Sequence, residues 1–203
     1  DRRQRQMCIR DRTVVVSFIC FGNQTLAMKL ALSPYQVIHR QEWYRVVTHG
    51  FVHADMTHLL VNMFTFWSFG TYMEQYYQYV GLGKWGFLLL YFGGMIFASS
   101  FDLAKQKDNP YYLSIGASGA VSAVLFSSIF FDPWGKIYFF ALLPIPGILF
   151  GVIYLLYCQY MAKQASDHIN HNAHFLGALF GFLLPALLNP SLVKLFLGAL
   201  IGR

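Results

Sequence analysis

The sequence has few charged residues, and this scarcity excludes most soluble folds. Only 12% of its 203 residues are charged, whereas 56% are hydrophobic and the mean hydropathy is +0.44. Soluble domains carry about twice that share of charged side chains. The composition therefore predicts a polytopic membrane protein.

Cysteine is also scarce, and its spacing excludes several kinds of site. The three cysteines are Cys8, Cys20 and Cys158, and no two of them form a CxxC or CxxCH motif. A zinc ribbon and a covalent haem attachment need such spacings, and a disulfide or a metal site is unexpected in or beside apolar spans. Because two of the cysteines lie in or beside apolar stretches, we interpret them as packing residues.

Positive charge is concentrated at the N-terminus. Residues 1–12 hold five Arg and two Asp, and so contribute half of the net charge of +6. The rest of the chain is too weakly basic to indicate a nucleic-acid surface. We interpret residues 1–12 as a non-native or disordered basic segment, with a basic cytoplasmic flank as the alternative.

Long uncharged runs predict the fold class. A helix needs about 20 apolar residues to cross a bilayer. A shorter run, residues 13–22, has about half of that length and predicts a first helix that is truncated at its N-terminus. We therefore predict an all-α bundle of six transmembrane helices, with a membrane domain over residues 13–190 and a short apolar C-terminal tail over residues 191–203. The five full-length runs are residues 56–73, 85–101, 111–131, 137–162 and 169–193.

The segment between the first two predicted helices, residues 32–55, mixes aromatic and charged side chains. Such a composition is typical of structure that lies in the membrane interface. Lys and Arg are distributed too evenly over the connecting segments to decide the orientation of the bundle.

Polar side chains inside the apolar runs indicate where function lies, because they are costly in a bilayer. The first pair is His58 and Asn62, whose spacing of four residues places both on one face of a helix. Ser118 lies in the sequence Gly-Ala-Ser-Gly, and His174 lies in Ala-His-Phe-Leu-Gly. A single serine in a membrane helix more often bonds its own backbone or fills an interface of small residues.

Small residues recur every four positions beside Ser118 and His174. One ridge is Gly119, Ala123 and Ser127, and the other is Ala173, Gly177 and Gly181. Such ridges allow two helix backbones to approach closely. This packing would bring Ser118 next to His174, an imidazole base suited to activating a serine hydroxyl near neutral pH.

A third catalytic residue is not expected. The runs hold no acidic residue near His174, and Asp167 lies seven positions before it, about 10 Å along a helix. We therefore predict a Ser118–His174 dyad. The predicted oxyanion site consists of Asn62, His58 and Gly116, together with the backbone N–H of Ser118 near a helix N-terminus.

The ordered set of these motifs resembles the rhomboid family of intramembrane serine proteases, of bacterial type with a six-helix core, over about residues 14–190. The resemblance rests on HxxxN at His58 and Asn62, G-x-S-G at Ser118 and AHxxG at His174. Further similarities are Trp43 and Arg45 in the first loop, with Tyr44 between them, and His53 and Glu74. One departure is Ser122, where some members have an aromatic residue that stacks on the catalytic histidine.

The resemblance implies an intramembrane serine endopeptidase that cleaves transmembrane segments of membrane proteins. It implies a cytoplasmic N-terminus, no cofactor and no metal, and substrate entry past the fifth helix. The expected location is the bacterial inner membrane, among membrane lipids, with the active site opening to the periplasmic side. The oligomeric state stays open.

Three alternatives remain. A noncatalytic rhomboid-like factor would bind or chaperone membrane proteins without cleaving them. A metal-dependent membrane enzyme would use His168, His171 and His174, although they fan out around a helix and no HExxH motif is present. A transporter would require paired helix breaks, of which Pro144 and Pro146 are the single hint.

Overall fold

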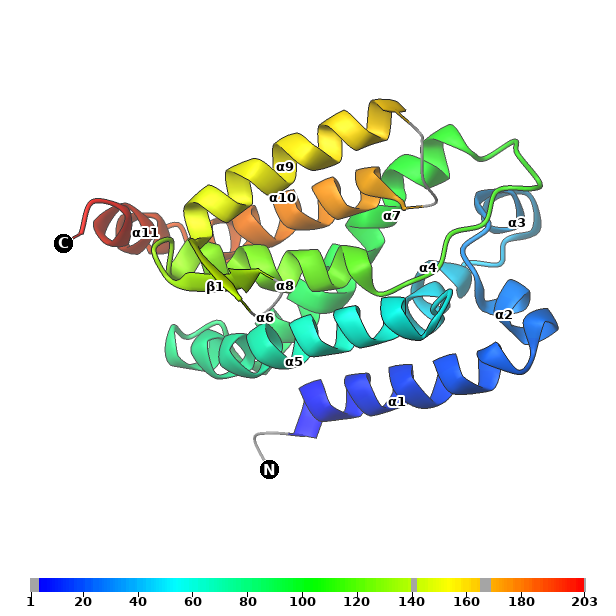
Figure 1. The fold of residues 1–203 in the computed structure, drawn as a ribbon, viewed down its shortest axis with the longest axis horizontal. Coiled ribbons are helices and arrows are strands. Elements are labelled where there is room, and N and C mark those ends of the chain that lie inside the picture. The colour runs from blue at the N-terminus through cyan, green and yellow to red at the C-terminus, as the bar shows by residue number, and fades with distance from the viewer. Residues whose placement is uncertain (1–3, 140–141, 165–168, 203) are drawn as a thin grey trace.

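In the computed structural model, residues 4–139, 142–164 and 169–202 are described, and helix α8 (Ser118–Phe131) lies at their centre. Every residue of α8 after Ser118 is buried. In Figure 1, α5 lies on one side of α8, and α1 lies beyond α5. The opposite side of α8 is covered by α9 and α10. The most extensive helix contact joins α8 to α10. The helix that begins with the candidate nucleophile is therefore enclosed by protein.

The described residues form mostly helices, which follow one another with short connections. The elements, in chain order, are α1 (Gln4–Phe21), α2 (Gln24–Leu30), α3 (Pro34–Arg40), α4 (Arg45–Thr48), the 3₁₀ turn η1 (His49–Phe51), α5 (Met56–Tyr79), α6 (Gly83–Leu88), the π-helical turn η2 (Leu89–Gly93), α7 (Gly94–Lys105), α8, β1 (Lys136–Phe139), β2 (Leu143–Pro146), α9 (Gly147–Gln164), α10 (His171–Leu188) and α11 (Leu192–Leu200).

By length and composition, two helical stretches among the described residues are able to cross a bilayer. They are Gly83–Lys105, which joins α6, η2 and α7, and α10. The apolar helix α8 is shorter. Large apolar side chains on α9 face outward, including Val152, Ile153 and Leu156, each of which is more than half exposed. Such a surface suits a lipid environment, because apolar side chains that are unfavourable in contact with water are not unfavourable in contact with lipid.

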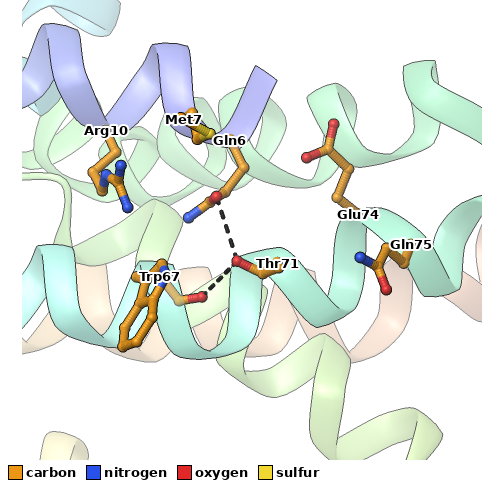
Figure 2. Close-up of a pocket in the computed structure, with 7 residues that line it drawn as sticks. All are labelled: Gln6, Met7, Arg10, Trp67, Thr71, Glu74 and Gln75. Carbon is orange, nitrogen blue, oxygen red and sulfur yellow. Dashed lines mark hydrogen bonds between the residues drawn. The ribbon is translucent and has the colours of Figure 1, made fainter. Parts of the chain in front are cut away.

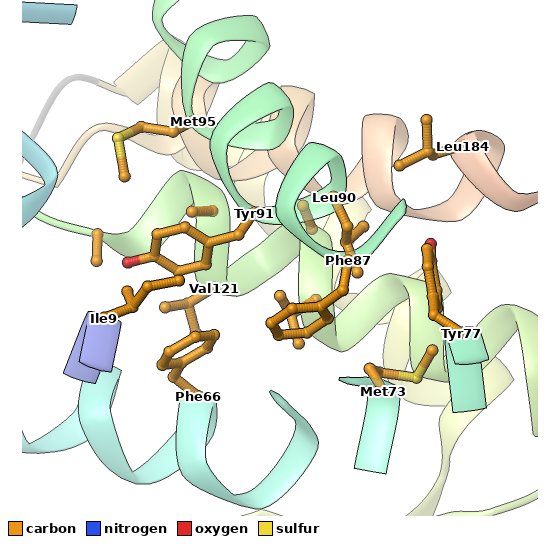
Figure 3. Packing of buried hydrophobic residues seen from close by; sticks show 14 of the residues in the cluster. Ile9, Phe66, Met73, Tyr77, Phe87, Leu90, Tyr91, Met95, Val121 and Leu184 are labelled. Atoms are coloured by element: carbon orange, nitrogen blue, oxygen red, sulfur yellow. The ribbon is translucent and has the colours of Figure 1, made fainter. Parts of the chain in front are cut away.

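The first helix begins earlier than the sequence analysis predicted. Helix α1 starts at Gln4 and not at Thr13, so the described part of the basic segment is helical. Ile9 lies in the core beside α5, as Figure 3 shows, and the Thr13 hydroxyl donates to the Ile9 carbonyl at 2.8 Å. Arginine is a good helix former, so charge in this segment is no barrier to helix formation.

The all-α prediction was wrong in one region. Strands β1 and β2 form an antiparallel hairpin in which Lys136 pairs with Pro146 and Phe139 with Leu143. Pro144 and Pro146 lack a backbone N–H, and two prolines this close together disfavour a helix interior, which each of them would kink or break. The run that was predicted as one helix over residues 137–162 is therefore a hairpin followed by α9.

The core on the α5 side of the molecule is largely aromatic. Phe66, Tyr77, Phe87 and Tyr91 are fully buried together (Figure 3), and the Phe66 and Tyr91 ring centroids are 4.7 Å apart. The predicted C-terminal tail also packs: α11 brings Phe196 against Phe130 of α8, with ring centroids 5.2 Å apart.

Candidate functional site

The backbones of α8 and α10 touch at two glycines. A Cβ atom added to Gly177 would lie 2.1 Å from the carbonyl oxygen of Gly119, and one added to Gly181 would lie 1.9 Å from that of Ala123. The close approach predicted from the two ridges is thus confirmed. Because both contacts advance along the two helices together, α8 and α10 run parallel and their N-termini lie at the same end of the bundle.

The two helix starts carry the two predicted catalytic residues. Ser118 is the first residue of α8 and His174 lies in the first turn of α10, and both are half-buried. Ser118 directly precedes Gly119, and His174 lies about one helical turn before Gly177, so both flank the contact between these two glycines. The positive ends of two helix dipoles also meet here, which favours negative charge.

An aromatic ring lies parallel to the His174 imidazole, and it comes from α9. The rings of Tyr154 and His174 have centroids 6.4 Å apart and planes inclined by 15°. The Tyr154 hydroxyl forms a 2.9 Å hydrogen bond with the hydroxyl of Ser122. Position 122 therefore has no aromatic ring of its own, but the Ser122 hydroxyl binds Tyr154, whose ring lies beside His174. The sequence analysis missed Tyr154, because no local motif connects it to the histidine.

The backbone just before Ser118 is held by the loop that precedes α5. The Gly116 N–H donates to the His49 carbonyl at 3.0 Å, and the Ala117 N–H donates to His53 Nε2 at 3.4 Å. Gly116 has φ of +118°, a conformation that favours glycine. A Cβ atom there would lie 2.7 Å from the His58 ring, so glycine is needed both for conformation and for space.

The hydrogen bonds of His53 define its neutral form. The Ser17 hydroxyl donates to the Phe51 carbonyl at 2.9 Å, so its oxygen is left to accept from His53 Nδ1–H, also at 2.9 Å. Nε2 then has the lone pair that the Ala117 N–H requires. Burial is the main cause that lowers the pKa of His53 to about 3; the nearby His58 acts in the same direction and Asp55 opposes it. A neutral imidazole therefore connects α1 to the backbone beside Ser118.

The two side chains predicted for oxyanion binding lie at the start of α5. Asp55 caps this helix by accepting from the His58 N–H at 2.8 Å, and the His58 ring lies against Gly116. Asn62 is buried, and its Nδ2 donates to the His58 carbonyl at 2.9 Å. An amide has two N–H hydrogens. One of them is used within the helix, which leaves the second for another acceptor.

The start of α10 is tied to α7 and to the segment before α8. Asn170 caps α10 through its Oδ1, which accepts from the Ala173 N–H at 3.0 Å. Its amide nitrogen donates to the Asp102 carboxylate and lies 3.3 Å from the hydroxyl oxygens of Tyr112 and Ser114. The sequence analysis did not identify Asp102 or Asn170. Asp167 and His168, which it considered, lie outside the described residues.

In the first loop, Arg45 has a structural role. Its guanidinium donates to Glu42 at 2.6 Å and to the carbonyls of Met28 and Ala31 at 2.8 Å each. The hydrogen bond from Arg45 also lowers the pKa of the Glu42 carboxyl. Arg45 therefore ties the first loop to α2, and its own carbonyl lies 2.9 Å from His49 Nδ1.

Cys158 is not an isolated packing residue. It lies on α9, and its sulfur is grouped with ring nitrogens of His171 and His174 so that the three ligand atoms are all within 4.8 Å of one another. Cys158 and His171 are buried. The sequence analysis considered a cluster of His168, His171 and His174. In the structure, the residue grouped with His171 and His174 is Cys158 of the neighbouring helix α9.

A second site candidate, a pocket between α1 and α5, lies away from Ser118. It has a volume of about 350 Å³, and Figure 2 shows the side chains that line it. Glu74 in this pocket is 16 residues beyond His58 on the same helix, which is about 24 Å of axial rise. The pocket therefore does not belong to the Ser118 site. Its lining residues are Gln6, Met7, Arg10, Trp67, Thr71, Glu74 and Gln75.

Comparison with known proteins agrees with the motifs. The profile of the Rhomboid domain matches residues 40–191, about three quarters of the chain. The putative rhomboid protease YdcA of Bacillus subtilis is 32% identical over 150 residues, which cover 70% of this chain and 66% of YdcA. Rhomboid protease GluP of the same organism is 29% identical over 152 residues, covering 75% of this chain and 27% of GluP.

A plant relative is also similar: RHOMBOID-like protein 12, mitochondrial, of Arabidopsis thaliana is 27% identical over 148 residues, which cover 66% of this chain and 43% of the relative. The chain thus spans less than half of that protein's length. The mostly helical fold and the matching profile define a rhomboid domain of an integral membrane protein. This chain belongs to the rhomboid family.

Proposed function

We propose that the protein is an intramembrane serine endopeptidase that cleaves transmembrane segments, with Ser118 as nucleophile and His174 as general base. The observation that carries the proposal is the backbone contact between Gly119 and Gly177. It holds two parallel helices together beside the two residues that the reaction needs. Two relatives that bear the name rhomboid protease support the same reading.

In the proposed reaction, His174 accepts the proton of the Ser118 hydroxyl as its oxygen attacks the substrate carbonyl carbon. The carbonyl oxygen becomes an oxyanion, and His174 then gives the proton to the leaving amine. Donors for the oxyanion are the free N–H of Asn62, the His58 ring and the Ser118 N–H at the start of α8. Gly116 leaves room for the substrate chain. Water then hydrolyses the acyl-enzyme.

The proposed setting is a six-helix bundle surrounded by lipid, in which α1, α5, the α6–α7 stretch, α8, α9 and α10 are the spans. Its N-terminus would be cytoplasmic and its active site would open to the periplasmic side of a bacterial inner membrane. Transmembrane proteins are the proposed substrates, and neither a cofactor nor a metal takes part in this reaction.

Labelling with a fluorophosphonate tests the proposal directly. The purified protein should react covalently in detergent, and Ser118→Ala should abolish the reaction. His174→Ala should slow it strongly, whereas Ser100→Ala, which removes an exposed hydroxyl of α7, should leave it unchanged. Equal labelling of wild type and Ser118→Ala, or no labelling of a folded wild type, would instead support a noncatalytic membrane-protein-binding role.

A transmembrane reporter tests whether the two residues act as one unit. The double variant Ser118→Ala/His174→Ala should cleave the reporter hardly more slowly than either single variant, because each change disables the same step. Losses that multiply would show that the two side chains act independently.

A further inference from the structure

Cys158, His171 and His174 come together from two antiparallel helices. Cys158 faces the start of α10 from the second half of α9, and the ring of Tyr157 packs edge-on against His171 with centroids 5.5 Å apart. The sulfur and the ring nitrogens all lie within 4.8 Å of one another. Cys158 and His171 are buried, whereas His174 is half-buried.

The chemistry of these three ligands selects a particular class of cation. One thiolate and two imidazoles suit Zn²⁺ and its close substitutes, whereas Mg²⁺ and Ca²⁺ require oxygen ligands. Around tetrahedral Zn²⁺, ligand atoms at 2.0–2.3 Å are about 3.3–3.8 Å apart. The present separations, none longer than 4.8 Å, exceed this range by about 1.5 Å at most, a difference of the size that side-chain rotation closes. Three protein ligands leave a fourth position for water or the Ser118 hydroxyl.

We propose that Cys158, His171 and His174 bind Zn²⁺ or a similar thiophilic divalent cation, and that this binding inhibits the protease. On binding, the Cys158 thiol releases its proton to solvent, and each imidazole binds in its neutral form through one nitrogen lone pair. The metal thereby holds His174 so that it no longer serves as the base for Ser118. No oxidation or reduction is involved. The inhibitory part of the inference rests on the proposed function, whereas metal binding does not.

Cobalt binding tests the site without reference to activity. Co²⁺ added to Ser118→Ala protein in detergent should give the near-ultraviolet thiolate-to-cobalt band and the intense visible bands of a tetrahedral site. Cys158→Ala and the near-isosteric His171→Asn should lose these bands, and Cys20→Ala, which removes another buried thiol, should retain them. Thermal unfolding of each variant confirms that it is folded. No thiolate band, or a band that survives Cys158→Ala, would overturn the site.

Reporter cleavage tests the inhibition. Zn²⁺ should inhibit wild type reversibly, a chelator should restore cleavage, and Mg²⁺ should have no effect. Cys158→Ala should raise the Zn²⁺ concentration for half-inhibition at least about tenfold, since even the loss of an outer contact weakens metal sites by that factor. Cobalt bands without inhibition would refute the regulatory role. A protein that binds cobalt but neither cleaves nor labels would refute the proposed function and leave the metal site standing.

Discussion

The glycine at position 181 is expected to be indispensable for packing α10 against α8. In Gly181→Ala the new Cβ would lie 1.9 Å from the carbonyl oxygen of Ala123. Carbon and oxygen approach to about 3.3 Å without repulsion, so the helices must separate by roughly 1.4 Å at this point. The obstacle is backbone, which cannot rotate away as a side chain does.

The expected cost follows from two opposing effects. Overpacking a close contact costs about 1–3 kcal/mol, and a backbone obstacle places this change at the upper end. Alanine regains up to about 1 kcal/mol through its higher helix propensity. Gly181→Ala should therefore lower the free energy of unfolding by about 2 kcal/mol.

Gly151→Ala provides the matched control on α9. A Cβ atom there would meet Ile129 and Phe126 at 3.4 Å, which is ordinary contact. This variant should be as stable as wild type or slightly more stable. We would compare the melting temperatures of the three proteins in one detergent. If Gly181→Ala melts with or above Gly151→Ala, the close α8–α10 contact is refuted.

Three further predictions concern the side chains around the site. Tyr154→Leu should lower kcat at least about tenfold by removing the ring beside His174, whereas Tyr154→Phe should lose little activity; equal kinetics for both variants and wild type would exclude a positioning role. Asn62→Ala should lower kcat on the order of 10²-fold to 10³-fold with KM unchanged, and a loss matched by a fallen melting temperature would indicate a structural role instead. For His53 the pKa is lowered from 6.5 to about 3 on folding, so the unfolded state binds more protons within that window and stability should fall as pH drops from 6.5 towards 3. His53→Gln should reduce this dependence, and an unchanged pH profile of the melting temperature would contradict it.

The contact between α8 and α10 was predicted from the spacing of small residues along each helix. The ridges of small residues that contain Gly177 and Gly181 repeat every four residues, and such a repeat determines which face of a helix approaches its neighbour. The contact with α8 was therefore predictable, and so were the helical positions of Ser118, His174 and Asn62. The catalytic roles of these residues stay predictions.

Contacts between helices without matching motifs were not predictable. Tyr154 and Cys158 reach His174 from α9, and nothing in their own helix marks them as neighbours of that side chain. The hairpin before α9 was missed because its hydropathy is that of a span, although Pro144 signalled a break. The start of α1 was misjudged because charge was weighed above helix propensity.

The shortness of α8 bears on where the proposed reaction would take place relative to the membrane. Its 14 residues measure about 21 Å, against about 30 Å for the hydrocarbon core of a bilayer. A lipid-exposed helix of this length would thin the bilayer around it, but surrounding helices shield α8 on all sides. In the proposed membrane setting, Ser118 would lie below the level at which a full-length span emerges. In the proposed reaction, the scissile peptide bond of a substrate would have to move down to Ser118, over a distance that depends on the thickness of the bilayer.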